Sequence, residues 1–542
     1  MNNYKYISFY GIETIPKFLQ NAARDFENHL IEIFSGQELL DVPTIELVLE
    51  QSEKITKKLH NNKEGFIISS NKKRTDSRDT INFILKGLTA RSLMYACYGL
   101  LHHLGIRWYF PGDNYTLTRE IEDVLEILCS EIHLISIPAF KKRGIVIYRT
   151  NDLFDEWLKY SMRTRMNYIV LHSEDGLELS DQIYHQYGLY LSLEEHIFDK
   201  KICSNNSARF SKAYTKVKRK LHKIPSNPDT NEKELYFWLA DTIIRRCSCS
   251  KHQEWNAAEV HLDFVNHLIE KLNRENPKIK FSWLAYMGSF KAIRKLKPHP
   301  NIILEIAPMH RCFNHSIKDP DCLLNWKKVL TPINQLKELF PPENRQVLGY
   351  WLDPSLFGRQ EYLIGGWARE KERGRVPHIP FIMQEDIQFY HNNDFKNILT
   401  FAVNLDRKYC NTYTSPLIPL YPLLCWNPES DIEKELKKFN HYYLGLTRSY
   451  PLFLKNEKID PKEVSLKELR AFYFQWNGLI SYIKQNSGKI RRNLGDKLYQ
   501  RRVSQLLKEY RELNRLRKRY VQGKIMGYLW QKGLRILELL LS

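Results

Sequence analysis

The stretch GIVIYRTND, residues 144–152, decides between two kinds of α/β fold. Its apolar first half is typical of a parallel strand that is buried on both faces. A doubly wound open sheet usually has a glycine-rich phosphate turn after its first strand. Here the residues after the apolar run contain no glycine. The stretch therefore favours a closed barrel over the doubly wound sheet.

Seven further strand-like runs follow at intervals along the chain, and helix-like stretches with apolar residues on a three-to-four repeat lie between several of them. Eight strands with crossovers over about 290 residues predict a (β/α)8 (TIM) barrel, which we place at residues 137–428. The predicted strands are 144–149, 167–172, 188–193, 234–240, 279–286, 301–307, 346–352 and 397–404, and the predicted helices are 155–164, 256–273, 323–340 and 385–392.

The segments on either side of the barrel differ from each other in pattern. Residues 1–136 mix β-like runs at 44–50, 64–69 and 80–85 with a helix at 90–104, and predict a small α+β domain. Residues 429–542 lack β signals and predict a helical extension. Its expected helices are 431–443, with Ser430 as the N-cap, 466–485 and 495–541.

The charge balance is strongly basic. The chain of 542 residues has 82 Lys and Arg against 62 Asp and Glu, a net charge of +20, and about 13 of this excess lies in residues 429–542. The basic stretch 489–520 has two interpretations: a helix packed on the barrel with a solvated basic face, or a contact with an anionic glycan or a membrane surface. Because no RNA-binding motif accompanies it, nucleic acid is the weakest partner class.

Neither a membrane span nor a secretory signal is predicted. No apolar run approaches the roughly 18–20 residues that a bilayer requires. The first residues, MNNYKYISFYGIETIP, lack the charged start, apolar centre and cleavage site of a signal peptide. We therefore expect a cytoplasmic location.

Six segments carry a family resemblance. The segment LMYACYGLLHHLGIRWYFPGD at 93–113 resembles the small domain that precedes the barrel in alpha-glucuronidases and beta-N-acetylhexosaminidases. Over residues 80–450 the ordered set is similar to a bacterial family labelled as a domain of unknown function and grouped with glycoside hydrolases. The other five segments are IPAFKKRG (137–144), MNYIVLH (166–172), LADTIIRRCSCSKH (239–252), HRCFNHSIKDPDCLLN (310–325) and LLCWNPESDIEKELKKFNHYYLG (423–445).

The resemblance implies glycoside hydrolysis, or a related carbohydrate reaction, at the carboxyl ends of the barrel strands, where barrel enzymes carry their chemistry. Cleavage of a glycosidic bond needs a carboxylic acid and, in most families, a second carboxylate. The catalytic candidates are Asp241, Glu305 and Asp353, and apolar neighbours such as Trp238 and Tyr350 could raise the pKa of the acid. The structural alternatives are a helix cap at Asp241, an ion pair with a buried Arg at Glu305, and a turn at Asp353.

Substrate-binding candidates are the polar and aromatic residues near other strand ends. Guanidinium and imidazole groups form directed hydrogen bonds to vicinal hydroxyls. The alternative for Arg143 is a salt bridge at the bottom of the barrel. The predicted substrate-binding residues are Arg143, Asn167, His172, His196, Tyr286, His310, Arg311 and Trp351.

The sequence departs from the related families in two places. Hexosaminidases place adjacent Asp and Glu after the fourth strand, whereas this chain has Asp241 followed by Thr242. The third cysteine of the related family's cluster is His252 here. The first departure favours the alternative of a carbohydrate-binding protein with a degenerate cleft; a third alternative is a scaffold that acts through its basic helices.

The nine cysteines do not form a disulfide scaffold, because an odd number leaves at least one thiol unpaired. Two clusters have residue types that suit zinc: Cys247-x-Cys249-x2-His252, and Cys312-x2-His315 with Cys322. The Cys-x-Cys spacing, however, is not the usual spacing of zinc ligands. A Cys312–Cys322 disulfide is a second interpretation, and buried thiols are the one we favour. The sequence thus predicts no metal and no cofactor.

Overall fold

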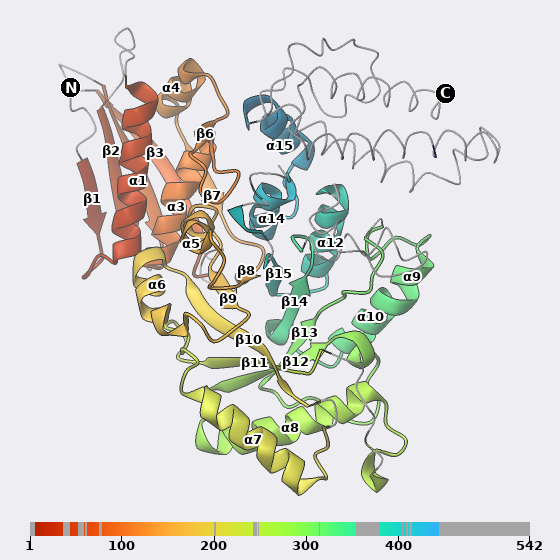
Figure 1. Ribbon diagram of the computed structural model, residues 1–542. Helices are drawn as coiled ribbons and strands as arrows, with labels where there is room; N and C mark the ends of the chain where they lie inside the picture. The colour runs from red at the N-terminus through yellow and green to blue at the C-terminus, as the bar shows by residue number, and fades with distance from the viewer. Residues whose placement is uncertain are drawn as a thin grey trace.

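A five-stranded sheet with its helices and an eight-stranded barrel make up most of the computed structural model (Figure 1). The structure describes residues 6–35, 44–52, 59, 62–74, 79–199, 202–241, 247, 249–313, 315–353, 380–403, 405–407, 410, 415–443 and 504.

The amino-terminal sheet has the strand order β1-β2-β4-β3-β7. The strands β1, β2 and β4 run parallel, whereas β3 is antiparallel to both of its neighbours. The helices α1 (Lys17–Phe34) and α3 (Ala90–His103) lie side by side on one face of the sheet (Figure 1). The strands span Tyr6–Tyr10 (β1), Thr44–Gln51 (β2), Phe66–Arg74 (β3), Asp79–Gly87 (β4) and His133–Ser136 (β7).

The predicted strands and the predicted helix of this region are confirmed. The helix α3 begins with a capping box formed by Thr89 and Ser92. The Thr89 side chain accepts a hydrogen bond from the backbone of Ser92, and the Ser92 side chain accepts one from the backbone of Thr89. The prediction missed β1, α1, α4 (Ile121–Cys129), β7 and the short pair β5 (Ile106–Arg107) and β6 (Thr116–Leu117).

The barrel is closed and entirely parallel, in the order β10-β11-β12-β13-β14-β15-β8-β9. Each of the eight predicted runs overlaps one of its strands. They span Lys142–Ile147 (β8), Tyr168–Leu171 (β9), Tyr190–Phe198 (β10), Lys233–Leu239 (β11), Ile279–Ala285 (β12), Ile302–Ile306 (β13), Arg345–Gly349 (β14) and Asn397–Phe401 (β15).

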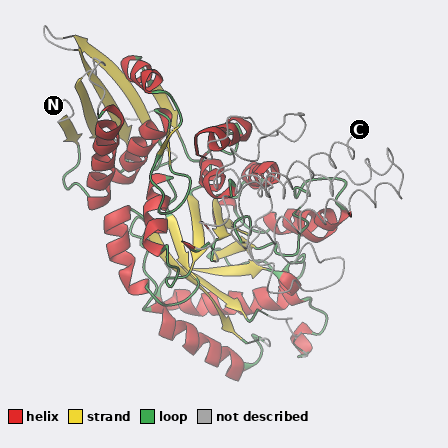
Figure 2. Cartoon of the chain, turned by 45° about the horizontal axis from the view of Figure 1, so that its top comes forward, coloured by secondary structure: helices red, strands yellow, loops and turns green. Residues whose placement is uncertain are grey.

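Helices surround the strands on the outside (Figure 2). Between β12 and β13, however, residues 286–301 contain only the 3-10 turn Met287–Ser289. The four predicted helices are present, but α6 and α7 were missed because α6 buries only Ile183 and α7 only Tyr214 and Val217. The helices are Phe154–Arg163 (α5), Ser180–Tyr187 (α6), Ser207–Leu221 (α7), Ala257–Glu275 (α8), Leu323–Asn325 (α9) with the π-helical Trp326–Leu330 (η4), Thr331–Lys337 (α10), Pro380–Asn392 (α12) and Leu417–Trp426 (α14).

The barrel interior is polar at its amino end. Lys142 forms an ion pair with Glu234 and donates to the Tyr236 hydroxyl at 2.5 Å and to Gln346 Oε1 at 3.1 Å. The Gln346 amide in turn donates to Glu305 Oε1 at 2.7 Å. Because a buried polar group without a partner costs stability, this connected set lets the interior hold charges.

A buried ionic contact joins the amino-terminal domain to the amino end of the barrel. Glu64 lies 2.7 Å from Arg143 Nη2 and 3.3 Å from Arg91 Nε, and it accepts a hydrogen bond from Asn167 at 3.0 Å. The side chain of Arg143 is fully buried and also packs against the Trp426 ring. One carboxylate therefore serves two buried guanidinium groups from different parts of the chain.

The carboxyl-terminal region continues as α15 (Ile432–Lys438) and the π-helical turn Phe439–Tyr443. Its N-cap is Asp431, whose side chain accepts from the Lys434 backbone at 2.9 Å. The predicted Ser430 cap is wrong, because the Ser430 hydroxyl donates to the Asn427 carbonyl instead. The expected helices at 466–485 and 495–541 and the basic stretch 489–520 lie outside the described residues, apart from Ser504.

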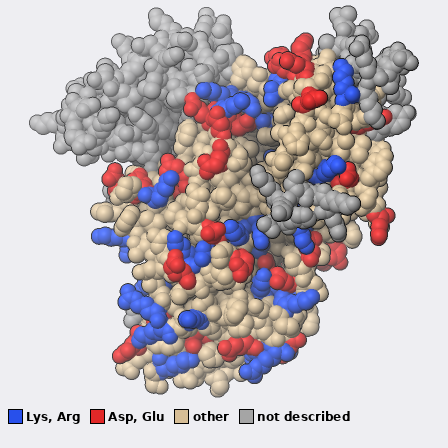
Figure 3. All heavy atoms as spheres, turned by 180° about the vertical axis from the view of Figure 1, so that it is seen from behind, with Lys and Arg blue, Asp and Glu red and all other residues tan. Residues whose placement is uncertain are grey.

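Two surface features bear on partner classes. Among the described helices, none is both long and apolar enough to cross a membrane. On the face seen in Figure 3, the described residues carry acidic and basic groups side by side. That face therefore shows no broad field of one sign.

Replacing Glu64 tests the contact between the domain and the barrel. We expect Glu64→Gln to lower the free energy of unfolding by about 3 kcal/mol, because it leaves the buried Arg143 without its anion and leaves Arg91 with Asp229 alone. Urea unfolding measures the change. The control is Glu50→Gln, which removes an exposed pair with Lys86 and should cost less than about 1 kcal/mol. Equal effects of the two substitutions would contradict the structural role of Glu64.

Candidate functional site

The carboxyl ends of the barrel strands, with the residues directly after them, form the mouth of the barrel. At its centre is a pair of His172, directly after β9, and Glu194 of β10. The His172 Nδ1 lies 2.8 Å from Glu194 Oε1. Glu194 is fully buried, and its Oε2 atom has no hydrogen-bond partner among the described residues. A half-satisfied buried carboxyl at the mouth points to an interaction with a further group.

Each member of the pair shifts the pKa of the other. Burial raises the pKa of Glu194, and the hydrogen bond and charge of His172 partly offset this rise. Burial lowers the pKa of His172, but the hydrogen bond and the charge of Glu194 outweigh it, so that the pKa is raised from its ordinary value. The hydrogen bond therefore favours the charged form of each partner, whereas burial favours the neutral form of each.

A second group of side chains lies beside this pair. The His196 ring lies 6.4 Å from the His172 ring and 5.2 Å from the Trp238 ring, between centroids. The Tyr286 hydroxyl donates to Asp241 Oδ1 at 2.9 Å. Asp241 follows β11 and is exposed to solvent, and its charge acts on both imidazoles. The mouth thus combines two imidazoles, a phenol and an accessible carboxylate.

Glu305 of β13 lies in the interior below these groups. Its Oε2 accepts from Trp238 Nε1 at 3.0 Å and from the Ser282 hydroxyl at 2.5 Å, and its Oε1 accepts from Gln346. Burial, followed by the charge of Glu194, raises the pKa of Glu305 to about 7. The expected alternative, a pair with a buried Arg, is wrong, because amide, indole and hydroxyl donors surround this carboxyl.

Aromatic rings line the opposite side of the mouth. The His172 ring lies 5.4 Å from Tyr148 and 5.6 Å from Phe401, and Phe401 stacks on Tyr350 at 5.1 Å. Burial raises the pKa of Tyr148, and the charges of Glu194 and Asp353 add to the rise. Asp353, which is buried, therefore lies within electrostatic reach of the same wall.

Five of the sequence-predicted residues do not join this group. Arg143 and Asn167 lie at the amino end of the barrel, where Glu64 holds them, so the salt-bridge alternative describes Arg143. Arg311 pairs with Asp386 of α12 with both side chains buried, and Trp351 donates to the same carboxylate at 3.1 Å. These four are corrections to the predicted site, since their polar groups are already bound inside the protein. The fifth, His310, is exposed in the turn after β13.

The prediction also missed residues that the structure places at the mouth: Glu194, Tyr148 and Phe401. A signal existed for Glu194, because two acidic residues, Glu194 and Glu195, interrupt an otherwise apolar strand. The helix-cap alternative for Asp241 is excluded, since Asn256 caps α8.

Two groups of cysteine and histidine side chains have the donor atoms of a metal site. In each group the ligand atoms lie within 4.8 Å of one another. None of the nine cysteines forms a disulfide, so the alternative of a Cys312–Cys322 bond is wrong. The groups are Cys203, Cys247, Cys249 and His252, and Cys312, His315 and Cys322.

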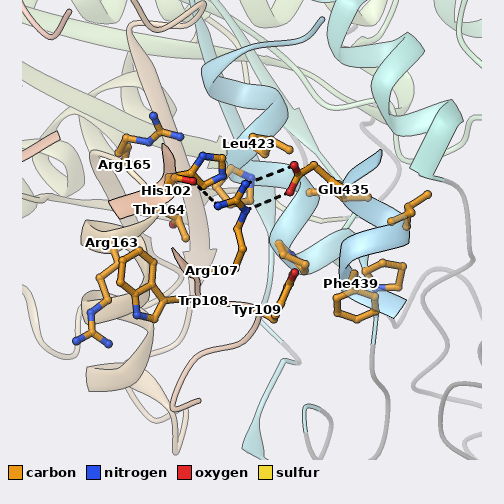
Figure 4. A pocket seen from close by; sticks show the side chains of 15 residues that line it. His102, Arg107, Trp108, Tyr109, Arg163, Thr164, Arg165, Leu423, Glu435 and Phe439 are labelled. Carbon is orange, nitrogen blue, oxygen red and sulfur yellow. Dashed lines mark hydrogen bonds and ion pairs between the residues drawn. The ribbon is translucent and has the colours of Figure 1, made fainter. Parts of the chain in front are cut away.

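A pocket of about 600 Å³ lies away from the mouth, between the amino-terminal domain and the helices α14 and α15. Figure 4 shows Arg107 between His102 and Glu435. Arg107 donates to the His102 carbonyl at 2.6 Å and to Glu435 Oε2 at 3.2 Å. Because its guanidinium group is already neutralised, we assign this pocket to the contact between the domains rather than to ligand chemistry.

A comparison with known families finds one match, and it covers most of the residues at the mouth. Residues 126–335 match a family model described as a domain of unknown function (DUF4838). The match spans β8 to β13, and so includes His172, Glu194, Asp241 and Glu305. No curated protein matches the chain. The description of the family assigns no activity, so the chemistry of the mouth must be argued from its residues.

The charge state of His172 can be tested directly. We expect its pKa to lie above 6.5, and to fall in Glu194→Gln because burial then opposes the charge without the hydrogen-bonded carboxylate of Glu194. NMR titration of histidine-labelled protein measures this, with the signal assigned by His172→Gln. A folded pKa above the unfolded value means that protonated His172 stabilises the fold below pH 6.5, and that this contribution is lost as the pH rises through the folded pKa.

His196 is the internal control for this titration. Burial lowers its pKa, and its main hydrogen-bond partner is the Leu239 carbonyl rather than Glu194. Its pKa should therefore stay below 6.5 in both proteins. A pKa of His172 below 6.5 in the unmodified chain would contradict the proposed pair.

Proposed function

We propose that the barrel is a (β/α)8 (TIM) barrel whose mouth binds a carbohydrate and hydrolyses a glycosidic bond. The observation that carries the proposal is the meeting of Asp241, Tyr286, His196 and the His172–Glu194 pair at the carboxyl ends of neighbouring parallel strands. Helices follow most of the strands, which supports the barrel class.

The chemistry of the mouth suits a sugar. Aromatic rings offer apolar faces, and imidazole, phenol and carboxylate groups offer directed hydrogen bonds to hydroxyls. Tyr148 supplies a half-buried ring on one side, where Phe401 and Tyr350 are buried in the wall, and His172 and His196 supply the imidazoles. Small-molecule sites usually combine apolar surfaces with a few convergent polar groups, and these residues provide both.

We assign proton transfer to Asp241 because it is a solvent-exposed carboxylate whose charge acts on both imidazoles, and because the Tyr286 hydroxyl orients it. Asp353 is the proposed second carboxylate, on the side of Tyr148 and Tyr350. Glu305 is fully enclosed, so we assign it a positioning role through Trp238, whose indole donates to it. This assignment narrows the three predicted catalytic residues to two.

A second candidate function is carbohydrate binding without turnover. It is favoured by the sequence Asp241-Thr242, which lacks the acidic residue that follows the aspartate in hexosaminidases. The resemblance alone does not separate the two candidates, because fold does not determine activity.

A glycan array followed by a cleavage assay tests both candidates. We expect the purified chain to bind a subset of glycans and to release a shorter product, detected by mass spectrometry. Asp241→Asn should retain binding within about threefold and reduce turnover about 10²- to 10⁴-fold, the usual contribution of a general acid or base. The control is Asp199→Asn, which removes an exposed carboxylate just after β10 that pairs with Lys212.

The outcomes separate the candidates. Binding without cleavage of any bound glycan supports the binding-only function. Loss of turnover in Asp199→Asn, or full turnover in Asp241→Asn, contradicts the assignment of Asp241. If the chain binds none of the glycans on the array, the carbohydrate proposal is overturned.

A further inference from the structure

Four donor side chains from two loops of the barrel meet at one point. Cys203 lies in the turn between β10 and α7, and Cys247, Cys249 and His252 lie between β11 and α8. The geometry points to a zinc site with three thiolates and one imidazole, and we propose that this site ties the two loops together. The proposal does not depend on the sugar chemistry of the mouth.

The distances between the donor atoms fit a tetrahedral ion. Zinc–sulfur bonds of about 2.3 Å and zinc–nitrogen bonds of about 2.0–2.1 Å give tetrahedral edges of roughly 3.8 Å between sulfurs and 3.5 Å between sulfur and nitrogen. Cys203 Sγ lies 3.0 Å from Cys247 Sγ and 3.7 Å from Cys249 Sγ. The His252 Nδ1 lies 3.7 Å from Cys203 Sγ and 3.3 Å from Cys249 Sγ. Small shifts would therefore complete the coordination.

The second ring nitrogen of His252 has the partner that metal-binding histidines usually have. His252 Nε2 lies 3.0 Å from Asp263 Oδ2, and Asp263 also accepts hydrogen bonds from Lys251 and Ser204. A carboxylate on one nitrogen fixes the tautomer and turns the other nitrogen toward the metal. Both His252 and Cys203 are buried, so the imidazole is held in this orientation by its surroundings.

Three thiolates and one imidazole favour zinc as the bound ion, in a structural rather than a catalytic site. Thiolates with an imidazole favour zinc over magnesium or calcium, which prefer oxygen ligands. Four protein ligands leave no open position, which is the arrangement of structural rather than catalytic zinc. Binding releases three thiol protons to solvent, and the complex of Zn²⁺ with three thiolates and a neutral imidazole has a charge of −1.

The site has a consequence for the mouth. Asp241 lies on the β11–α8 loop, six residues before Cys247. Anchoring this loop to the turn that follows β10 limits the positions open to Asp241. The predicted absence of a metal overlooked Cys203, which lies 44 residues before Cys247 in the sequence.

Metal analysis of the full-length chain tests the proposal. After purification without added metal and passage over a chelating resin, we expect about one zinc ion per chain, measured by inductively coupled plasma mass spectrometry. Cys203→Ser should reduce this content at least about tenfold, because it removes a buried ligand. The matched control is Cys312→Ser, in the second donor group, which offers only three donors and should leave the zinc content unchanged.

A second variant keeps the test decisive when Cys203→Ser does not fold. Asp263→Asn retains all four ligands and should weaken zinc binding about 10- to 100-fold, measured by competition with a chromogenic chelator. Cobalt substitution adds a spectroscopic readout, since tetrahedral Co²⁺ with thiolate ligands gives intense visible absorption. Equal zinc affinity in Asp263→Asn and the unmodified chain would contradict the role of Asp263 and the site with it.

Other outcomes overturn the proposal. Zinc content that persists in Cys203→Ser and disappears in Cys312→Ser would move the metal to the second group. If the chain contains no zinc, and Cys203 and Cys247 react with a thiol reagent only after reduction, the two cysteines form a disulfide instead. A chain without zinc in which all nine thiols react after unfolding would leave only buried thiols.

Discussion

The closed barrel must fill its interior with side chains, and in this protein several of those side chains are charged. Lys142, Glu234 and Glu305 all point inward, and a buried charge without a partner costs several kcal/mol. Tyr236 and Gln346 form hydrogen bonds that connect these three side chains, so that each of the three has a counterion or a hydrogen-bond donor. The rest of the structure depends on this network, because the same interior supports the groups at the mouth.

The network also sets the electrostatics of the mouth. Glu305 and Glu194 occupy one low-dielectric interior, where the charge of one carboxyl raises the pKa of the other. The hydrogen bond from His172 to Glu194 opposes this rise. Trp238 connects the two levels, since its indole donates to Glu305 while its ring contacts His196. Residues enclosed in the interior can therefore influence the exposed groups at the mouth.

Patterns that are local in sequence were predictable from the sequence, and contacts between distant segments were not. The eight strands follow from continuous apolar runs, and α3 follows from its capping residues and its periodicity. By contrast, α7 packs through only two buried side chains, so its sequence shows little apolar period. The burial of Arg143 against Glu64 joins residues 79 positions apart, and no motif marks that pair. Strand-end position thus identified His172 and Asp241 but also suggested Arg143, which lies at the opposite end.

The two ends of the barrel have different physical properties. At the amino end, Glu64 and Glu234 are ion-paired with Arg143 and Lys142, so their charges are already used in holding the domains and strands together. At the carboxyl end, Glu194 keeps an oxygen with no hydrogen-bond partner in the described part of the chain, and Asp241 is exposed to solvent. A buried carboxyl oxygen without a partner is costly in a purely structural role, because pairing or neutral replacement would stabilise the fold. Its place beside imidazoles with displaced pKa values supports the proposed binding site at the mouth.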